Sequence, residues 1–262
     1  MKSGNGSMEV EEDMLRHILL NTLRATKIRY KEYGNVVIAC DDKNYWRKNI
    51  FPYYKANRKK NRDESDVDWP AIFSALEKFK VELKENFPYK VIQVPHAEAD
   101  DIIAVLTKKY HTDGILIASH DKDYQQLQKY PLVKQYSNVM NRELICLTPE
   151  KYLLEHIIKG DTGDGIPNCL SPDNSLVMKI RQKPITTKRL DQISNNFDLV
   201  DDDTKRNFFR NKALIDFEEI PENIETQIID AFEAQEYGDR KKIFNYFMQK
   251  RMKNLMESIS EF

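Results

Sequence analysis

The spacing of hydrophobic residues alternates along the chain between two patterns, and the alternation predicts helices between short strands. Short apolar runs bounded by glycine, proline or acidic residues are typical of buried strands. Such runs predict strands over 36–40, 89–94, 115–119, 132–136 and 143–147. Apolar residues at helical spacing predict helices over 9–33, 69–85, 97–111, 152–159, 207–216, 221–236 and 240–258. Residues 170–205 are polar without a clear period, so we predict no element there.

The order of these elements predicts an α/β fold. Strands that alternate with helices are expected to form a mainly parallel central sheet with helices on both faces, and 143–147 is expected at an edge. The second half of the chain has few strand signals. We therefore predict a core domain over residues 8–149 and a smaller C-terminal helical domain over residues 150–262.

Composition narrows the class of protein. The chain has 262 residues, and 41 basic and 42 acidic residues give a net charge of −1. Affinity for nucleic acid would therefore need a local basic patch. No apolar run approaches the roughly 20 residues of a membrane span, and the first seven residues lack the apolar stretch of a secretory signal. The three cysteines form no CxxC pair, which suits a reducing cytosol. The five histidines show no zinc-ligand spacing.

Acidic residues follow the predicted strands. Asp41 ends the first strand, Asp121 and Asp123 follow the strand at 115–119, and Glu98 and Asp101 share one face of a helix. In open α/β sheets ligands bind at the carboxyl ends of strands. Two carboxylates ~4 Å apart repel by ~4 kcal/mol at an effective dielectric of 20, so a divalent cation is expected between them. Oxygen ligands favour magnesium or manganese.

Each acidic motif alone has an ordinary explanation. A single acidic triplet is more often a solvated turn, and the glycine-rich turn that holds Asp161 and Asp164 could be a common Asx turn. The metal hypothesis therefore depends on several such motifs occurring in order.

A basic and aromatic segment, residues 43–62, separates the first acids from the others. It contains Lys43, Arg47, Lys48, Lys55, Arg58, Lys59, Lys60 and Arg62, with Tyr45, Trp46, Phe51, Tyr53 and Tyr54 between them. Basic side chains bind phosphates and aromatic rings stack on unpaired bases, so we predict nucleic-acid contact. The alternative is a solvated basic face whose aromatic rings belong to the core.

Taken in order, these motifs resemble the 5′-nuclease (flap endonuclease) superfamily. The resemblance depends on Glu98-Ala-Asp-Asp101, Asp121-Lys-Asp123, Gly160-Asp161-Thr-Gly-Asp164 and Tyr54-Lys55-Ala-Asn-Arg58. It covers about residues 9–170 well and the C-terminal helices more loosely. Within the superfamily the chain looks closest to the ribonuclease H branch of T-even bacteriophages.

The resemblance implies a magnesium-dependent 5′→3′ exonuclease and flap endonuclease. Such an enzyme acts on branched or nicked DNA and on RNA-primed duplexes, and it removes RNA primers during DNA replication. Hydrolysis would use two Mg²⁺ ions roughly 4 Å apart, for which Mn²⁺ can substitute. The implied partners are DNA and RNA–DNA hybrids with a 5′ flap or end, a single-strand-binding protein and a sliding clamp. We expect a monomer in the cytoplasm of a phage-infected bacterial cell.

Residue roles also follow from the resemblance. The implied metal ligands are Asp41, Glu98, Asp100, Asp101, Asp121, Asp123, Asp161 and Asp164. Lys55 and Arg58 would be catalytic, in a basic arch of about residues 43–66. Nucleic acid would contact Lys43, Arg47, Lys48, Tyr54, Lys55, Arg58, Lys59, Lys60 and Arg62.

The sequence departs from the family pattern in two places. The family begins with a strand that ends in a metal-binding aspartate, and nothing before Glu9 predicts such a strand. Residues after Pro167 lack the Gly-x-Gly hairpin that binds potassium, so no potassium site is expected. A chain without the first ligand could be a weakened or inactive flap-binding protein. A PIN-like ribonuclease is a further alternative, and an aspartyl phosphatase is poorly supported because Asp41 lacks a second aspartate two residues on.

Overall fold

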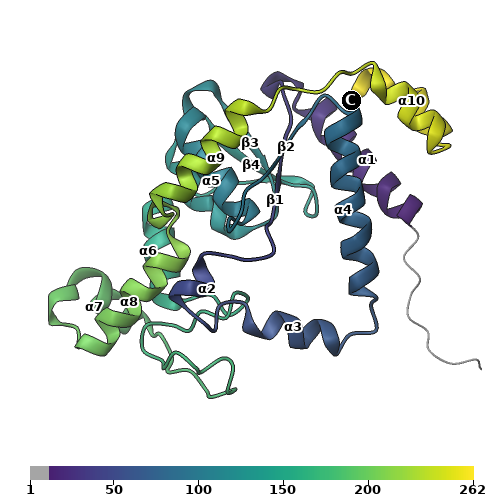
Figure 1. The fold of residues 1–262 in the computed structure, drawn as a ribbon. Coiled ribbons are helices and arrows are strands. Elements are labelled where there is room, and N and C mark those ends of the chain that lie inside the picture. The colour runs from purple at the N-terminus through teal and green to yellow at the C-terminus, as the bar shows by residue number, and fades with distance from the viewer. Residues whose placement is uncertain (1–11) are drawn as a thin grey trace, which may run out of the picture. The chain divides into compact units, whose positions relative to one another are not determined.

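The computed structural model describes residues 12–262. The predicted domain start at residue 8 and the predicted lack of a first strand fall outside the described residues. The structure divides into two compact units that each draw on several parts of the sequence (Figure 1). Unit 1 comprises the described part of residues 1–40 together with 62–92 and 230–262, and unit 2 comprises 41–61 and 93–229. The predicted boundary between residues 149 and 150 stays a prediction.

Unit 1 is a helical layer with a small sheet. Its elements are α1 (Glu12–Arg29), a 3-10 turn at Lys31–Tyr33, β1 (Val37–Cys40), α4 (Trp69–Asn86), β2 (Lys90–Gln93, shared with unit 2 at its end), α10 (Lys242–Gln249), α11 (Lys253–Met256) and a 3-10 turn at Ile259–Glu261. The core of this unit is aromatic: the ring of Phe87 packs against Tyr89, Tyr246, Phe247 and Phe262. Because Phe262 and Phe87 are both fully buried, the end of the chain is part of the core.

Unit 2 contains the second sheet and most of the remaining helices. The strands are β3 (Ile115–Ala118), β4 (Val133–Ser137) and β5 (Arg142–Leu144). The helices are α2 (Arg47–Ile50), α3 (Ala56–Asp63, which continues into unit 1), α5 (Ala99–Tyr110), α6 (Pro149–Lys159), α7 (Thr187–Asn195), α8 (Asp202–Ile215) and α9 (Glu222–Ala234, also shared). The 3-10 helices are Lys122–Lys129, His111–Asp113, Phe197–Leu199 and Phe217–Glu219.

The prediction of one mainly parallel central sheet is corrected. The strands of the described residues form two small sheets, β1–β2 and β3–β4–β5. β3 and β4 are parallel with Ile115 opposite Val133, whereas β5 turns back antiparallel at the edge, as expected for that strand. The helical C-terminal half is confirmed. An apolar run indicates that a strand is buried, but it does not show which strand is its neighbour. The sequence therefore did not predict that the strands form two sheets.

The predicted helix over 240–258 is also corrected, because it breaks between α10 and α11. Arg251 takes a left-handed backbone conformation with φ of 56°. The apolar spacing hides the break because Phe247, Met252 and Leu255 on both sides of it pack into the same core.

In the segment 170–205, for which no element was predicted, α7 forms, and side-chain hydrogen bonds hold the irregular chain before it. Asn207 Nδ2 donates to the carbonyl oxygens of Cys169 (2.9 Å) and Ser171 (3.2 Å).

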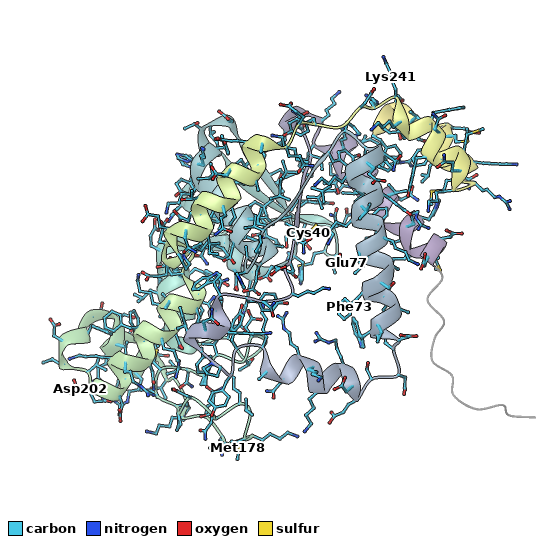
Figure 2. The ribbon with its side chains drawn as sticks, in the orientation of Figure 1. Cys40, Phe73, Glu77, Met178, Asp202 and Lys241 are labelled. Carbon is cyan, nitrogen blue, oxygen red and sulfur yellow. The ribbon has the colours of Figure 1, made fainter. Side chains whose placement is uncertain are left out.

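Side chains show how α4 meets the end of the basic segment within unit 1. Phe73 and Glu77 lie one turn apart on α4 (Figure 2). The guanidinium of Arg62 lies 5.6 Å from the centre of the Phe73 ring. Within residues 12–262, no helix combines the length and the apolar character that crossing a membrane requires.

Candidate metal and nucleic-acid site

The start of α5 places the first acids by a capping arrangement. Glu98 is the N-cap residue, and its backbone N–H donates to Asp101 Oδ2 at 2.9 Å. The same oxygen accepts from Trp46 Nε1 at 3.0 Å, and Asp101 Oδ1 pairs with Arg47 Nη1 at 2.7 Å. The Asp101 side chain is fully buried. Its oxygens are occupied by protein groups, so the structure gives Asp101 a supporting position behind the other carboxylates.

Glu98 is buried but surrounded by donors. Arg47 Nη1 and the Tyr54 hydroxyl each donate to Oε2 at 2.9 Å, and Lys55 Nζ donates to Oε1. Burial raises the pKa of Glu98, but Arg47 and Lys55 outweigh it and hold the pKa below its ordinary value. Glu98 is therefore an anion even inside the protein.

Lys55 and Arg58 join this group to Asp164. Lys55 Nζ lies 3.5 Å from Asp164 Oδ2, and Arg58 Nη2 lies 2.5 Å from Oδ1. Burial lowers the pKa of Lys55, but Asp164 and Glu98 raise it by more, so the ammonium stays charged. Lys55 has a left-handed backbone (φ 54°), and its N–H donates to the Asp164 carbonyl at 2.7 Å. A strained conformation held by a specific contact is typical of functional positions.

The glycine-rich turn fits closely against this part of the chain. Gly160 and Gly165 have φ of 69° and 76°. A Cβ on Gly165 would lie 2.9 Å from the Tyr53 carbonyl oxygen, and a Cβ on Gly160 would lie 2.5 Å from the Ile166 carbonyl oxygen. Only glycine allows both the positive φ and the close approach. Gly165 therefore lets the turn place Asp164 next to Lys55.

Asp41 and Asp121 are exposed, whereas Asp100 is half-buried. Asp41 Oδ1 accepts the Ala99 N–H at 2.8 Å, which ties it to the start of α5. Burial raises the pKa of Asp100 to about 6, although the Tyr124 hydroxyl donates to its Oδ1 at 2.5 Å. Asp121 is exposed, and its Oδ1 accepts the Asp123 N–H at 2.9 Å.

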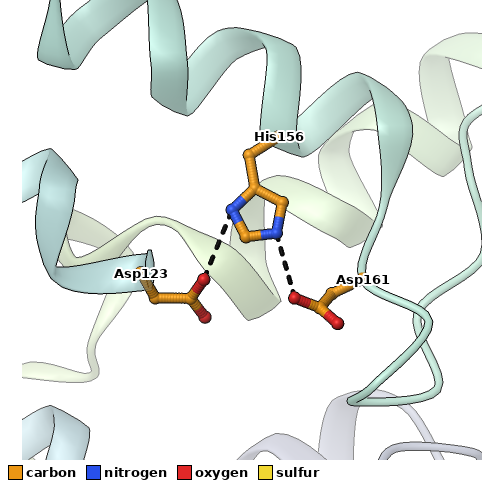
Figure 3. A group of neighbouring side chains, drawn as sticks. All are labelled: Asp123, His156 and Asp161. Atoms are coloured by element: carbon orange, nitrogen blue, oxygen red, sulfur yellow. Dashed lines mark hydrogen bonds and ion pairs between the residues drawn. The ribbon is translucent and has the colours of Figure 1, made fainter. Parts of the chain in front are cut away.

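Asp123 and Asp161 face each other across a histidine that the sequence interpretation missed. His156 Nδ1 lies 3.5 Å from Asp123 Oδ1, and Nε2 lies 3.1 Å from Asp161 Oδ2 (Figure 3). Burial raises the pKa of Asp123 to about 7, against the opposing effect of His156. Burial also raises the pKa of Asp161, but His156 and Lys122, whose Nζ is 2.8 Å away, lower it well below its ordinary value.

Electrostatic coupling shows that the acids form one group within unit 2. Asp121, Asp161 and Asp164 each raise the pKa of Asp123. Asp121 and Glu98 act on Asp100 in the same direction. Asp41, Asp100 and Asp121 all act on the Tyr124 hydroxyl. We call the set Asp41, Glu98, Asp100, Asp121, Asp123, Asp161 and Asp164 the carboxylate cluster.

The cluster has the properties of a cation site. Asp123 Oδ1 and His156 Nδ1 are buried without a hydrogen-bond partner. One donor atom each from Asp123, His156 and Asp161 lie within 4.8 Å of one another. Buried polar atoms without partners are rare in native proteins, and acids at this density repel one another. A divalent cation would satisfy both conditions.

The predicted basic residues are placed in two ways. Arg47 is buried, with Nε donating to the Leu214 carbonyl at 2.9 Å, and the Tyr54 ring is buried as well. These positions differ from the open arch that was expected of them. Arg58 stands partly exposed at the cluster. The other predicted basic residues are exposed or, for Arg62, half-buried: Lys43, Lys48, Lys59, Lys60 and Arg62.

Some functional candidates could not be identified from the sequence. Trp46, Lys122, Tyr124 and His156 each contact a cluster acid or Asp101. For His156, the sequence shows only that it precedes Asp161 by five residues, across the end of α6. This spacing matches no common metal motif, so it did not indicate a ligand.

Comparisons with known proteins identify the family of the chain. Residues 13–155 match the family model for the 5′-3′ exonuclease N-terminal resolvase-like domain, and residues 148–262 match the model for the C-terminal part of T4 RNase H. The chain is 33% identical to ribonuclease H of Enterobacteria phage T4 over 276 aligned residues, which cover 97% of this chain and 88% of that protein.

Solved structures show a similar fold. The T5 D15 flap endonuclease in a complex with DNA and metal ions matches with a TM-score of 0.62 and 17% identity, over 88% of this chain and 93% of that one. The T5 5′-exonuclease with bound divalent metal ions (zinc) matches with a TM-score of 0.60 and 18% identity, over 83% of this chain and 90% of that one.

Proposed function

Because this chain is a 5′-nuclease that belongs to the 5′-3′ exonuclease and flap endonuclease family, we propose that it removes 5′ flaps and RNA primers from nicked or branched duplexes during DNA replication. The T4 relative named ribonuclease H covers nearly the whole chain, which supports RNA-primed substrates. The flap endonuclease structure with DNA supports a DNA flap as a second substrate. The same relatives suggest action in a phage-infected cell. A single-strand-binding protein, a sliding clamp and a monomeric state remain predictions.

One observation carries the proposal: the carboxylate cluster lies in direct contact with two basic side chains, Lys55 and Arg58. We propose that the cluster holds two Mg²⁺ or Mn²⁺ ions. Divalent ions bound there supply Lewis-acid activation of the scissile phosphate and of the attacking water. We leave Asp101 out of the ligand set because its oxygens pair with Trp46 and Arg47.

The residues of the chain then have separate tasks. Lys55 and Arg58 pair with Glu98 and Asp164, and both can turn to the anionic phosphate when cations occupy the cluster. Charge stabilisation of this kind is worth about 3–4 kcal/mol per donor in the transition state. Arg47 and Tyr54 keep Glu98 in position from the buried side, so base stacking by Tyr54 is not part of the proposal.

The test is a cleavage assay on a 5′-flap DNA and on an RNA-primed nicked duplex, with magnesium and with EDTA. We expect cleavage of both substrates only with the cation. The matched variant is Asp121→Asn, which removes an exposed charge with little change in shape. It should bind the flap and fail to cut it.

Other outcomes would overturn the proposal. Flap binding without cleavage at any magnesium or manganese concentration would identify a binding module. Preference for single-stranded RNA over a 5′-flapped DNA would identify a PIN-like ribonuclease.

A further inference from the structure

The imidazole of His156, on α6, lies between two acids of the carboxylate cluster. Its side chain is 6% exposed, and its two ring nitrogens face Asp123 and Asp161 from opposite sides (Figure 3). Nδ1 has no hydrogen-bond partner, and neither has the Asp123 oxygen that faces it. A buried imidazole usually makes hydrogen bonds with both nitrogens or is held by a metal ion.

The distances favour an ion over a direct hydrogen bond on the Nδ1 side. The 3.5 Å separation of Nδ1 and Asp123 Oδ1 is too long for a good hydrogen bond. First-row cations bind nitrogen and oxygen at about 2.0–2.2 Å, so neighbouring ligand atoms lie on the order of 3–3.5 Å apart. The observed separation falls within that spacing.

Asp161 holds the imidazole from the opposite side. Its Oδ1 accepts the N–H groups of Gly163 (2.8 Å) and Asp164 (3.2 Å), so the turn holds the carboxylate in place. Its Oδ2 lies 3.1 Å from His156 Nε2 and 2.8 Å from Lys122 Nζ. This contact orients the ring so that Nδ1 faces Asp123, and Nδ1 and Asp123 Oδ1 are the pair of atoms that a cation would join.

We propose that His156 is a nitrogen ligand of one of the two cations, which makes that position a mixed nitrogen and oxygen site that prefers Mn²⁺, Co²⁺ or Zn²⁺ to Mg²⁺. The proposal rests on the proposed function only in that the carboxylate cluster binds cations. Magnesium strongly prefers oxygen ligands, whereas imidazole suits the first-row transition metals. The remaining carboxylates offer oxygen alone, so the two positions would differ in selectivity.

The experiment uses the full chain and two matched histidine variants. His156→Gln keeps a polar side chain of similar length, and its amide offers oxygen in place of nitrogen. His111→Gln is the control, because His111 lies on the 3-10 turn 111–113, stacked on Tyr130, away from the cluster. Thermal unfolding without metal establishes that both variants fold.

Two readouts then follow, and neither needs catalysis. Electron spin-echo spectroscopy of bound Mn²⁺ should show nitrogen coupling in the wild type and in His111→Gln but not in His156→Gln. Calorimetric titration should show tenfold or greater loss of Mn²⁺ affinity at one site in His156→Gln, with Mg²⁺ affinity changed less than about threefold.

The outcomes separate the two proposals. Absent nitrogen coupling in a wild type that binds Mn²⁺ and cuts flaps would overturn the role of His156 and leave the nuclease function intact. Equal Mn²⁺ affinity of wild type and His156→Gln would do the same. A chain that binds no divalent cation and cuts no substrate would overturn the proposed function itself.

Discussion

Two acidic groups, one in each unit, are built on opposite principles. In unit 1, Glu82 on α4 accepts from Arg16 Nε (2.6 Å), the Tyr246 hydroxyl (2.7 Å) and Lys250 Nζ (2.6 Å). Burial raises the pKa of Glu82, but these partners outweigh it and lower the pKa. One carboxylate thus has an excess of donors. In unit 2, the cations that contact the carboxylate cluster are too few for its seven acids: Arg47, Lys55, Arg58 and Lys122, with the imidazole of His156 beside them.

The difference indicates which group stabilises the fold and which one has a function. Removal of one partner from a fully paired acid is costly, because the remaining charge loses its compensation. A group of acids with excess negative charge destabilises the fold unless something else binds there. Burial raises the pKa values of Asp100 and Asp123, and the neighbouring acids of the cluster add to the effect. Substitutions in one unit at a time test this difference.

The largest effect is expected from Asp121→Asn. Loss of one ion-binding charge should lower the single-turnover rate of flap cleavage by at least about a thousandfold. Flap affinity should stay within a few-fold of wild type, since the arch is untouched. Asp113→Asn, an exposed acid on the 3-10 turn 111–113, is the control and should cleave normally. Full cleavage by Asp121→Asn would contradict a functional cluster.

Lys55→Ala should follow, with a rate loss of about 10²–10³. The ammonium contacts Glu98 and Asp164, and its charge is poised for the phosphate. The measurement is the rate at saturating flap, which separates chemistry from binding. A variant that binds tenfold more weakly but cleaves at the wild-type rate would make Lys55 a binding residue only.

The acids of the cluster could be predicted from the sequence, whereas the paired group around Glu82 could not, because its partners Arg16, Tyr246 and Lys250 lie far from it along the chain. The order of acidic motifs identified the cluster because strand ends and helix starts bring short segments together. The basic segment could be recognised by its charge, but the sequence did not show which of its side chains are buried. Arg47 is buried because it forms ion pairs with Glu98 and Asp101, which are more than fifty residues away in the sequence. His156 was missed because its partners are set by the packing of α6, not by a local motif.

Glu82→Gln should lower the free energy of unfolding by about 2 kcal/mol, as expected for a largely buried acid that loses charge-assisted bonds. Chemical denaturation measures it. Glu77→Gln is the control on the same helix, because Glu77 is 58% exposed and pairs only with Lys80 at the surface. It should change stability by less than about 0.5 kcal/mol. Flap cleavage by folded protein should be normal in both variants, since neither residue belongs to the cluster.

Glu82 and Asp123 should contribute to the pH dependence of stability in opposite directions. The lowered pKa of Glu82 contributes stability that is lost as pH falls through it. The pKa of Asp123, raised from 3.8 to about 7, contributes stability that is present below pH 3.8 and is lost as pH rises through 7. The metal-free protein should therefore melt a few degrees lower at about pH 8 than at about pH 5.5. Asp123→Asn should flatten this dependence, and added Mn²⁺ should remove it in the wild type. An equal slope in Asp123→Asn would contradict the assignment.

The smallest effect is expected from Lys59→Ala. This variant is matched to Lys55→Ala, because both substitutions remove one positive charge. Lys59 lies on α3 and is exposed. A single phosphate contact of this kind should weaken flap binding a few-fold and reduce the slope of log affinity against log salt by about one. The rate at saturating flap should be unchanged, because Lys59 does not touch the cluster acids in any contact of the described residues. Titrations of both lysine variants over a range of salt concentrations make the comparison. If Lys59→Ala lost as much rate as Lys55→Ala, the total charge of the arch would matter and the position of Lys55 against Glu98 and Asp164 would not.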